Sequence, residues 1–422
     1  MNHIEYRETT LCCEDVPVAE LADEYGTPLY VYSKARMLEN YHGIRTALDD
    51  NAANICYALK ANSNLSLLSL LAAEGAGADV VSSGEIYLAL KAGFPASKIA
   101  FAGVGKREDE ILYALENDVT KFNVESVPEL QLLSLVALRL GKTAEVSLRV
   151  NPDIDAESHP YITTGLQSNK FGIPASAALD VYRLAATLPG LEVTGVHVHI
   201  GSQITKPDPF VATAAFLASF IPAVREAGVK ISHIDFGGGF GVRYFNAIRH
   251  EGLPVEDPSH NSISPPGDIL RKVMPILAPL GCSVWLEPGR SVIADAGMLV
   301  TRLLYSKTNG SRKFLIVDAA MTDLLRPSLY NAHHQIVPCA INSYDHETVD
   351  VVGPVCETGD FLAREREVNH VQQGDYLAVM TAGAYGFVNT SHYNARPRPA
   401  EVLVNGNKVR LIRPRESFEN LG

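Results

Sequence analysis

The chain has 422 residues, enough for two domains of ordinary size, and 46% hydrophobic and 20% charged residues are typical of a globular protein. Its 36 basic and 48 acidic residues give a formal net charge of −12. Because no run of lysine or arginine interrupts this acidic balance, nucleic acids and anionic membranes are poor candidate partners, and a small-molecule ligand is expected.

The first residues, "MNHIEYRETTLCCEDVP", contain no apolar run long enough for a secretory signal. No segment approaches the roughly 20 apolar residues that span a bilayer. The six cysteines are scattered, without a C-x-x-C pair or the spacing of a zinc ribbon. These features predict a cytoplasmic protein with reduced thiols and no metal site.

From about residue 54 to about residue 290, short β-branched or apolar runs alternate with stretches of helical periodicity. The expected strands are, in chain order, "ICYAL", "ADVVS", "IAFAG", "KFNVE", "EVSLRV", "VTGVHVHI", "ISHIDF" and "SVWLE". About eight such units fit a (β/α)₈ TIM barrel. An open doubly wound sheet would need fewer strands and a nucleotide fingerprint at its first turn.

After residue 295 the sequence indicates strands joined by turn residues, and "VNGNKV" is a good hairpin signal. Near the start of the chain, "TPLYVYS" is expected to add a strand to this part. We therefore predict a barrel domain over residues 33–294. Residues 1–32 and 295–422 are predicted to form an all-β domain, a Greek-key barrel or sandwich. The polar insertion 241–268 is predicted to cover part of the barrel mouth.

Polar and glycine-rich exceptions gather at one end of the expected strands. They are Lys60, Asp79, Arg149, His197 and His199, "GGGFG" at 237–241, and "EPGR" at 287–290. In TIM barrels the carboxyl ends of the strands carry the active site. A purely structural barrel would not show this distribution, so the sequence predicts a functional site at that end.

Taken singly, these features are ambiguous. Lys60 could be a solvated strand-end lysine, or a partly desolvated amine that forms Schiff bases. "GGGFG" could be a tight turn, or a set of backbone N–H groups that binds a phosphate monoester. Val242 stands where a dinucleotide fingerprint needs glycine or alanine. "HVHIG" could be a zinc pair or two packed histidines, "EPGR" a local ion pair, and Cys356 a small buried hydrophobe.

The ordered set of motifs is more specific than any single one. It comprises "YALKAN", "HVHIGSQ", "DFGGGFG", "LEPGRS", "GPVCETGD" and "AGAYGF". With this set the chain resembles the alanine-racemase-like (fold type III) pyridoxal-phosphate decarboxylases, and the resemblance covers essentially the whole chain. It implies pyridoxal 5'-phosphate as cofactor, which serves as an electron sink when an amino acid loses its carboxylate.

The resemblance also implies roles for individual residues. Lys60 matches the lysine that carries the cofactor, His199 the histidine stacked on its ring, and Glu287 the acid at its pyridine nitrogen. Ser202, Gly237, Gly238, Gly239, Gly289 and Arg290 match the phosphate-binding residues, and Tyr385 a tyrosine near phosphate and substrate. Asp79 and Arg149 are expected to orient the lysine and the ring environment. Cys356 matches a catalytic thiol from a second subunit, which implies a homodimer.

The stretch "VDAAMTDLLRPSLYNAHH" (317–334) resembles the family members that act on diaminopimelate. By this resemblance Arg326, Tyr330 and Arg290 bind the distal carboxylate of the substrate, and Glu357 pairs with its distal ammonium. A guanidinium matches a carboxylate bidentately. The expected reaction converts meso-2,6-diaminopimelate to L-lysine and CO₂, the last step of lysine biosynthesis.

The sequence departs from the family pattern at "SSGE", "VDAAMTD" and "SHYN". These departures leave the substrate range open. The alternatives are a related decarboxylase of ornithine, arginine or carboxynorspermidine, an amino-acid racemase on the same barrel, and a catalytically silent cofactor-binding homologue.

Overall fold

The computed structural model describes residues 3–48, 53–155 and 170–421. The chain divides into two compact units, each built from separate segments. The barrel unit comprises His42–Gly241 and Ser264–Gly289, and the β unit comprises Met1–Tyr41, Val242–Ile263 and Arg290–Gly422. Among the described residues, no helix is both long and apolar enough to cross a membrane.

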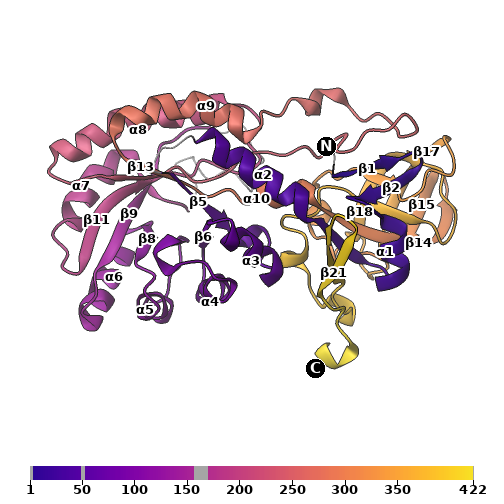
Figure 1. Ribbon diagram of the computed structural model, residues 1–422, viewed down its shortest axis with the longest axis horizontal. Coiled ribbons are helices and arrows are strands. Elements are labelled where there is room, and N and C mark those ends of the chain that lie inside the picture. Colours follow the sequence, from indigo (N-terminus) through magenta and orange to yellow (C-terminus); the bar gives the residue numbers. More distant parts are fainter. Residues whose placement is uncertain (1–2, 49–52, 156–169, 422) are drawn as a thin grey trace. The chain divides into compact units, whose positions relative to one another are not determined.

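The barrel unit is a closed parallel barrel (Figure 1). Within the described residues its eight strands are β5 (Ala53–Ala58), β6 (Gly77–Val80), β7 (Ile99–Phe101), β8 (Lys121–Val124), β9 (Ala144–Asn151), β11 (Leu191–His197), β12 (His233–Asp235) and β13 (Ser283–Leu286). Each pairs in parallel with the next, and the circle closes where Leu286 of β13 faces Ile55 of β5. A short strand, β10 (Ile173–Pro174), pairs with β9. The predicted TIM barrel and its eight strand segments are confirmed.

The helices of the barrel unit follow its strands in alternation. They are α3 (Leu65–Ala73), α4 (Ser83–Ala92), α5 (Glu108–Glu116), α6 (Val127–Leu140), α7 (Ala175–Ala185), α8 (Asp208–Glu226) and α9 (Pro266–Leu277). The helix α2 (Lys34–Ala47), which begins in the β unit and ends in the barrel unit, precedes the first strand. Ser82 and Ser126 cap α4 and α6 by accepting backbone N–H bonds. Gly93 and Gly141 end the same helices in the left-handed conformation, as expected from the glycines in the sequence.

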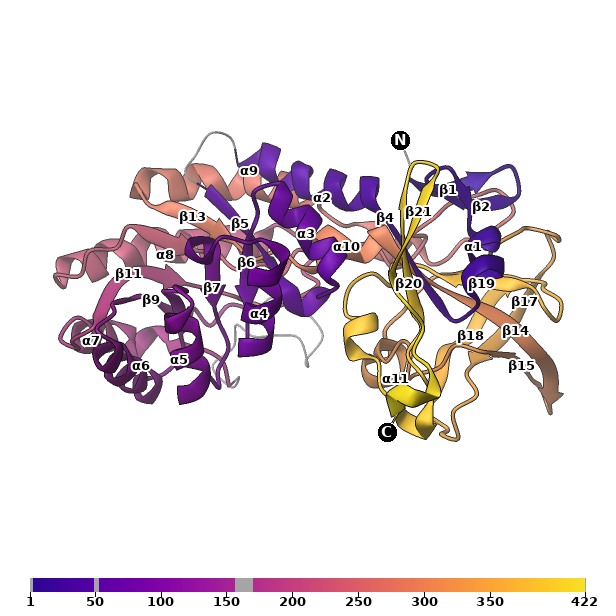
Figure 2. The ribbon, with the colours of Figure 1, turned by 60° about the horizontal axis from the view of Figure 1, so that its bottom comes forward.

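The β unit contains a mixed sheet in which strands from both ends of the chain are neighbours. Its strands include β4 (Leu29–Ser33), β14 (Gly297–Asn309), β15 (Arg312–Val317), β16 (Ile336–Pro338), β17 (His346–Val352), β18 (Phe361–Asn369), β19 (Tyr376–Val379), β20 (Ala400–Asn405) and β21 (Lys408–Arg413). The N-terminal β4 lies between β14 and β20 (Figure 2). Strands β20 and β21 form the hairpin predicted from "VNGNKV".

Smaller elements complete the β unit. They are the sheet of β1 (Ile4–Arg7), β2 (Thr10–Cys13) and β3 (Val16–Pro17), and the helices α1 (Val18–Tyr25), α10 (Arg290–Ile293) and α11 (Arg326–Tyr330). The N-terminal segment therefore contributes to the β-rich domain, as predicted.

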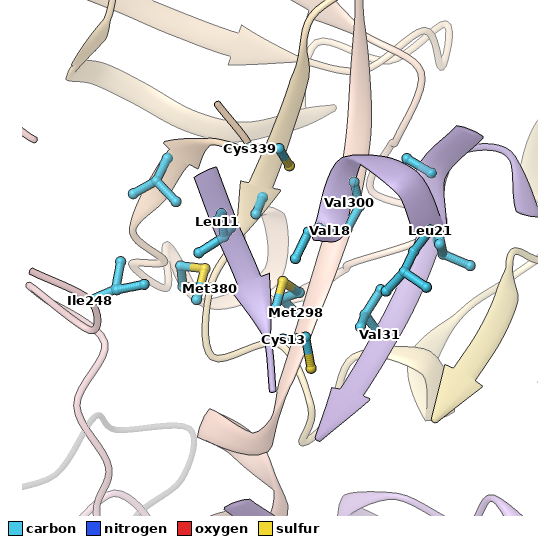
Figure 3. Close-up of a cluster of buried hydrophobic side chains, with 14 of the residues drawn as sticks. Leu11, Cys13, Val18, Leu21, Val31, Ile248, Met298, Val300, Cys339 and Met380 are labelled. Carbon is cyan, nitrogen blue, oxygen red and sulfur yellow. The ribbon is translucent and has the colours of Figure 1, made fainter. Parts of the chain in front are cut away.

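Apolar side chains from distant parts of the sequence form the core of the β unit (Figure 3). Leu11, Val31, Met298 and Val300 are completely buried in this core. Ile248, from the insertion after β12, packs into the same cluster. Burying such side chains stabilises the fold by about 1.5–3 kcal/mol each. The segment Val242–Ile263 is therefore part of the β unit, and its predicted role as a cover of the barrel mouth stays a prediction.

Candidate active site

Lys60 lies directly after the first barrel strand, in the short 3₁₀ helix Leu59–Ala61. Its Nζ donates a hydrogen bond of 2.6 Å to Oδ2 of Asp79, near the end of the neighbouring strand. The Asp79 side chain is 0% exposed, whereas that of Lys60 is 37% exposed. Burial and the nearby Glu287 raise the pKa of Asp79, and the charge of Lys60 opposes this rise. The partly exposed Lys60 side chain is thus hydrogen-bonded to a buried acid, Asp79.

A network of buried polar groups surrounds Glu287, which follows β13. Asn123 of β8 donates from Nδ2 to Oδ2 of Asp235 at 2.8 Å and to Oε1 of Glu287 at 3.1 Å. His197 Nε2 lies 3.4 Å from Oε2 of Glu287. The three groups His197, Asp235 and Glu287 offer ligand atoms within 4.8 Å of one another, a set that could also hold a metal ion. The structure therefore groups His197 with two acids.

The charges in this network favour an ionised Glu287. Burial alone would raise the pKa of Glu287, but His197 and Lys60 outweigh burial and hold it below its ordinary value. Burial and the charge of Glu287 raise the pKa of Asp235. Burial lowers the pKa of His197, yet the two acids outweigh it and the pKa is raised overall. Asp235 therefore retains its proton more readily than Glu287.

The glycine turn after β12 packs against the ends of two neighbouring strands. The N–H of Gly237 donates to Oδ1 of Asp235 at 3.0 Å, and that of Gly238 donates to Nδ1 of His199 at 3.2 Å. A β-carbon on Gly238 would collide with the carbonyl oxygen of Glu287. Within the described residues the Gly239 N–H has no protein acceptor. Of the three predicted phosphate-binding N–H groups, two are thus bonded inside the protein.

His199 lies at the carboxyl end of β11 and is half-buried. Because its Nδ1 accepts from a backbone N–H, this nitrogen carries the lone pair. Burial, followed by the positive charges of Arg149 and Lys60, lowers its pKa well below the ordinary value. The ring is therefore neutral. Ser202 lies three residues further on, in the loop before α8.

Arg149 lies in β9, where its guanidinium is paired with an acid that the sequence did not indicate. Its Nη1 donates to Oε1 of Glu125 at 2.9 Å, and both side chains are buried. The guanidinium also stacks on Phe171, with its Cζ 4.7 Å from the ring centroid. Glu125 further accepts from the N–H of Gly172. The predicted role of Arg149 near the cofactor stays a prediction.

In the β unit, two buried arginines contact the side chain of one tyrosine, Tyr244. Arg290, which begins α10 directly after Gly289, donates from Nη1 to the hydroxyl of Tyr244. Arg326, which begins α11, lies over the Tyr244 ring with Cζ 4.6 Å from its centroid. Each arginine is 7% exposed. Arg290 also lies over the ring of Tyr385, at 4.8 Å. This arrangement presents two positive charges at one place, which suits a carboxylate ligand.

The remaining predicted residues of the β unit lie in α11 and in one loop. Tyr330 ends α11, and Cys356 and Glu357 lie exposed in the loop 353–360. Buried Asp360 organises that loop by accepting from the N–H of Val355 at 2.7 Å. The Cys356 N–H donates to Asn394 at 2.9 Å. The loop therefore offers a thiol and a carboxylate side by side on a fixed backbone.

Sequence reasoning missed five residues that the structure adds to these groups: Asn123, Glu125, Asp235, Tyr244 and His334. Asp235 stands two residues before a flagged glycine, and its strand-end position could have indicated it. Glu125 ends the expected strand "KFNVE" in the same way, whereas Asn123 lies inside that strand. Tyr244 and His334 carry no signal in the sequence, because their importance arises from contacts with Arg290 and Arg326.

The residues of the barrel unit fit pyridoxal phosphate. Lys60 supplies an accessible amine, and Glu287 supplies an ionised carboxylate for a ring nitrogen. The glycine turn needs a residue without a side chain, because a β-carbon at Gly238 would collide with the carbonyl oxygen of Glu287, and the N–H of Gly239 is left for an anion. Lys60, Glu287 and the glycine turn all lie at the carboxyl ends of barrel strands.

Residues 34–294 match the family model described as pyridoxal-dependent decarboxylase, pyridoxal binding domain. A diaminopimelate decarboxylase of Aquifex aeolicus is 46% identical to this chain over 99% of the chain and 96% of its own length. A diaminopimelate decarboxylase of Vibrio cholerae is also 46% identical, over 100% of this chain and 98% of its own.

Solved structures give the same result. Diaminopimelate decarboxylase from Helicobacter pylori, complexed with L-lysine, is 40% identical with a TM-score of 0.88, over 96% of this chain and 98% of that one. Diaminopimelate decarboxylase from M. jannaschii, in co-complex with L-lysine, has a TM-score of 0.91 at 35% identity, over 100% of this chain and 96% of that one. The chain is a pyridoxal-phosphate-dependent decarboxylase and belongs to the diaminopimelate decarboxylase family.

Proposed function

We propose that this protein decarboxylates meso-2,6-diaminopimelate to L-lysine and CO₂, the last step of lysine biosynthesis. The observation that carries this proposal is the pair of buried arginines, Arg290 and Arg326, on Tyr244. Buried cations call for an anionic partner, and a substrate with a second carboxylate supplies one. The names of the relatives and the L-lysine bound in two of their structures support the same substrate.

In the barrel unit, Lys60 would hold the cofactor through its amine. When bound, the cofactor supplies an electron sink for the bond between the α-carbon and the carboxylate. Glu287, held ionised by its neighbours, would pair with the ring nitrogen of the cofactor and favour its protonated form, which strengthens the electron sink. His199, a neutral imidazole, would pack against the cofactor. Gly239, Ser202 and Gly289 would hold the phosphate end, and Gly237 and Gly238, whose N–H groups are bonded inside the protein, would shape the turn. By the family resemblance, Arg290 and Tyr385 of the β unit also belong to the phosphate-binding residues.

In the β unit, Arg290, Arg326 and Tyr330 bind the distal carboxylate, and Glu357 pairs with the distal ammonium. The thiol of Cys356 holds the proton that replaces CO₂ on the α-carbon. Following the family resemblance, we assign Cys356 to the active site of the second subunit of a homodimer. Asp79 positions Lys60 through its 2.6 Å hydrogen bond.

This arrangement distinguishes diaminopimelate from ornithine by the groups at the distal end of the substrate. Ornithine carries only an ammonium there and would leave the arginines without a carboxylate, which is costly at a buried site. An enzyme of this design therefore prefers diaminopimelate. We assign the protein to the cytoplasm and expect no nucleic-acid partner, in keeping with a net charge of −12.

Release of CO₂ from meso-diaminopimelate and from ornithine, measured side by side on the cofactor-loaded protein, tests the substrate. We expect turnover of meso-diaminopimelate and little or none of ornithine. A preference for ornithine would overturn the proposed substrate, while leaving membership of the decarboxylase family intact.

A further inference from the structure

Arg326 is fixed by a histidine rather than by an acid. Its Nη1 lies 2.8 Å from Nε2 of His334, and Nδ1 of the same ring lies 2.8 Å from the carbonyl oxygen of Met380. His334 is 0% exposed and its ring meets that of Tyr244 edge to face, with the centroids 5.1 Å apart. The imidazole thus bridges the start of α11 and the backbone after β19.

These two contacts define the protonation of the ring. A carbonyl oxygen only accepts hydrogen bonds, so Nδ1 of His334 carries the hydrogen. An arginine only donates, so Nε2 presents its lone pair to Arg326. A ring with one hydrogen and one lone pair is neutral. Burial and the charge of Arg326 favour the same state, because both lower the pKa of His334 well below its ordinary value.

Two other buried cations of this chain are paired with acids. Lys106 is paired with Glu129 at 2.7 Å, and Arg149 with Glu125 at 2.9 Å. Among the described residues, no carboxylate oxygen lies close enough to the Arg326 guanidinium, within 4.0 Å, to form an ion pair with it. A carboxylate would fix Arg326 but would also neutralise it. A neutral imidazole fixes its direction and leaves its charge available.

We propose that His334 is a positioning residue for substrate specificity: as a neutral hydrogen-bond acceptor it aims the Arg326 guanidinium at the distal carboxylate of the substrate without competing for its charge. The inference rests on the proposed function, since it takes the ligand of Arg326 to be that carboxylate. His334 itself does not touch the reacting atoms in this account.

Two ligands that differ by the distal carboxylate show how much this group contributes to binding. L-lysine, the expected product, retains the distal carboxylate and ammonium of meso-diaminopimelate. Pentane-1,5-diamine has the same chain and both amines but no carboxylate. The ratio of their dissociation constants, measured by calorimetry on the cofactor-loaded protein, reports how well the site recognises the carboxylate and does not depend on turnover.

The variants His334→Phe and His334→Gln separate the acceptor from the packing. Phenylalanine keeps an aromatic ring against Tyr244 but removes the acceptor, whereas glutamine retains an amide oxygen that can accept from Arg326. His333→Gln is the matched control, because its Nε2 lies 2.9 Å from Glu256 and not on Arg326. Arg326→Met reports the full loss of the guanidinium.

In the wild-type protein we expect L-lysine to bind more tightly than the diamine, and Arg326→Met to remove this preference. His334→Phe is expected to reduce the preference for L-lysine on the order of tenfold and to leave the affinity for the diamine unchanged. His334→Gln should recover part of the lost preference. His333→Gln should keep the wild-type preference. If His334→Phe does not fold, His334→Ala takes its place. The inference is overturned if His334→Gln and His334→Ala each bind L-lysine with the full wild-type preference over the diamine.

Two failures are distinguishable. If His334→Phe keeps the full preference while Arg326→Met loses it, the positioning role of His334 is wrong and the proposed substrate stands. If the wild-type protein binds both ligands equally, the proposed role of Arg326 is wrong, and the inference about His334 falls with it.

Discussion

Nζ of Lys60 lies 2.6 Å from Oδ2 of Asp79, and the acid is fully buried while more than a third of the lysine side chain is exposed. A buried carboxylate that has lost its hydration is strongly attracted to a nearby cation. Asp79 therefore fixes the position of the amine at the carboxyl end of β5.

Lys60→Ala is expected to abolish decarboxylation, with a loss of at least about 10³-fold, because no other residue supplies the amine in this account. Borohydride should fix pyridoxal phosphate covalently to the wild-type protein, with the added mass on the peptide that contains Lys60. Mass spectrometry of the two proteins checks this. Full activity of Lys60→Ala, or a label on another lysine, would refute the assignment.

Asn123→Leu removes an amide that donates to both Asp235 and Glu287. Leaving buried acceptors without their donor should cost about 1–3 kcal/mol in the free energy of unfolding. Because Glu287 loses a partner that fixes its direction, kcat and cofactor affinity should fall as well. Urea unfolding and cofactor titration measure these changes.

The matched variant Asn123→Asp has almost the same shape but adds an acid beside two others. Repulsion between like charges should make it less stable than Asn123→Leu at neutral pH. An Asn123→Asp protein as stable as the wild type would contradict this account of the network.

Cys356→Ala should lower kcat by about 10²–10⁴-fold, the usual contribution of a positioned acid, with little change in KM. If each active site takes Lys60 from one subunit and Cys356 from the other, the inactive variants Lys60→Ala and Cys356→Ala should complement each other. Mixing them under conditions of subunit exchange would form heterodimers with one intact site. Recovery of activity on mixing checks this, and a mixture that stays inactive despite exchange would refute the shared site.

His233 predicts how stability depends on pH. Its ring lies at the amino-terminal end of β12, edge to face with Trp285 at 5.0 Å. Burial, followed by the charge of Lys121, lowers its pKa to about 3. In the unfolded chain a histidine has a pKa of about 6.5, so between these values the unfolded chain binds more protons than the native protein. This contribution to stability is complete above pH 6.5 and is lost as pH falls toward 3.

The effect is at most about 1.4 kcal/mol per pH unit in this window. His233→Gln should therefore lose less stability than the wild type between pH 7.5 and pH 5.5, as measured by urea unfolding. His42→Gln is the control, because the His42 side chain is 49% exposed. Parallel losses in wild type and His233→Gln would contradict the assignment.

Much of the barrel could be predicted from the sequence because its strands are locally encoded. Each strand is a short apolar run bounded by a glycine or a polar residue, and all eight appear at the expected places. Lys60, Glu287 and the glycines were found because they interrupt such runs at the end where barrel sites lie. The β4 strand at the chain start was found in the same way.

The supporting residues could not be found this way, because their roles depend on packing between distant segments. Asn123 is an ordinary strand residue until the barrel closes and brings it to Asp235 and Glu287. Tyr244 lies in an insertion without periodicity, and only the fold of the β unit places its ring between Arg290 and Arg326. The neutral state of His334 follows from two hydrogen bonds that no local pattern encodes.

The reaction itself is tested most directly by its products. Removal of one carboxylate from meso-diaminopimelate gives L-lysine only if the carbon of D configuration reacts and the distal L centre stays in the arginine site. Incubation of the cofactor-loaded protein with meso-diaminopimelate should release CO₂ and L-lysine in equal amounts, as measured by gas release and chiral chromatography. Unchanged diaminopimelate, or lysine of D configuration, would contradict the account.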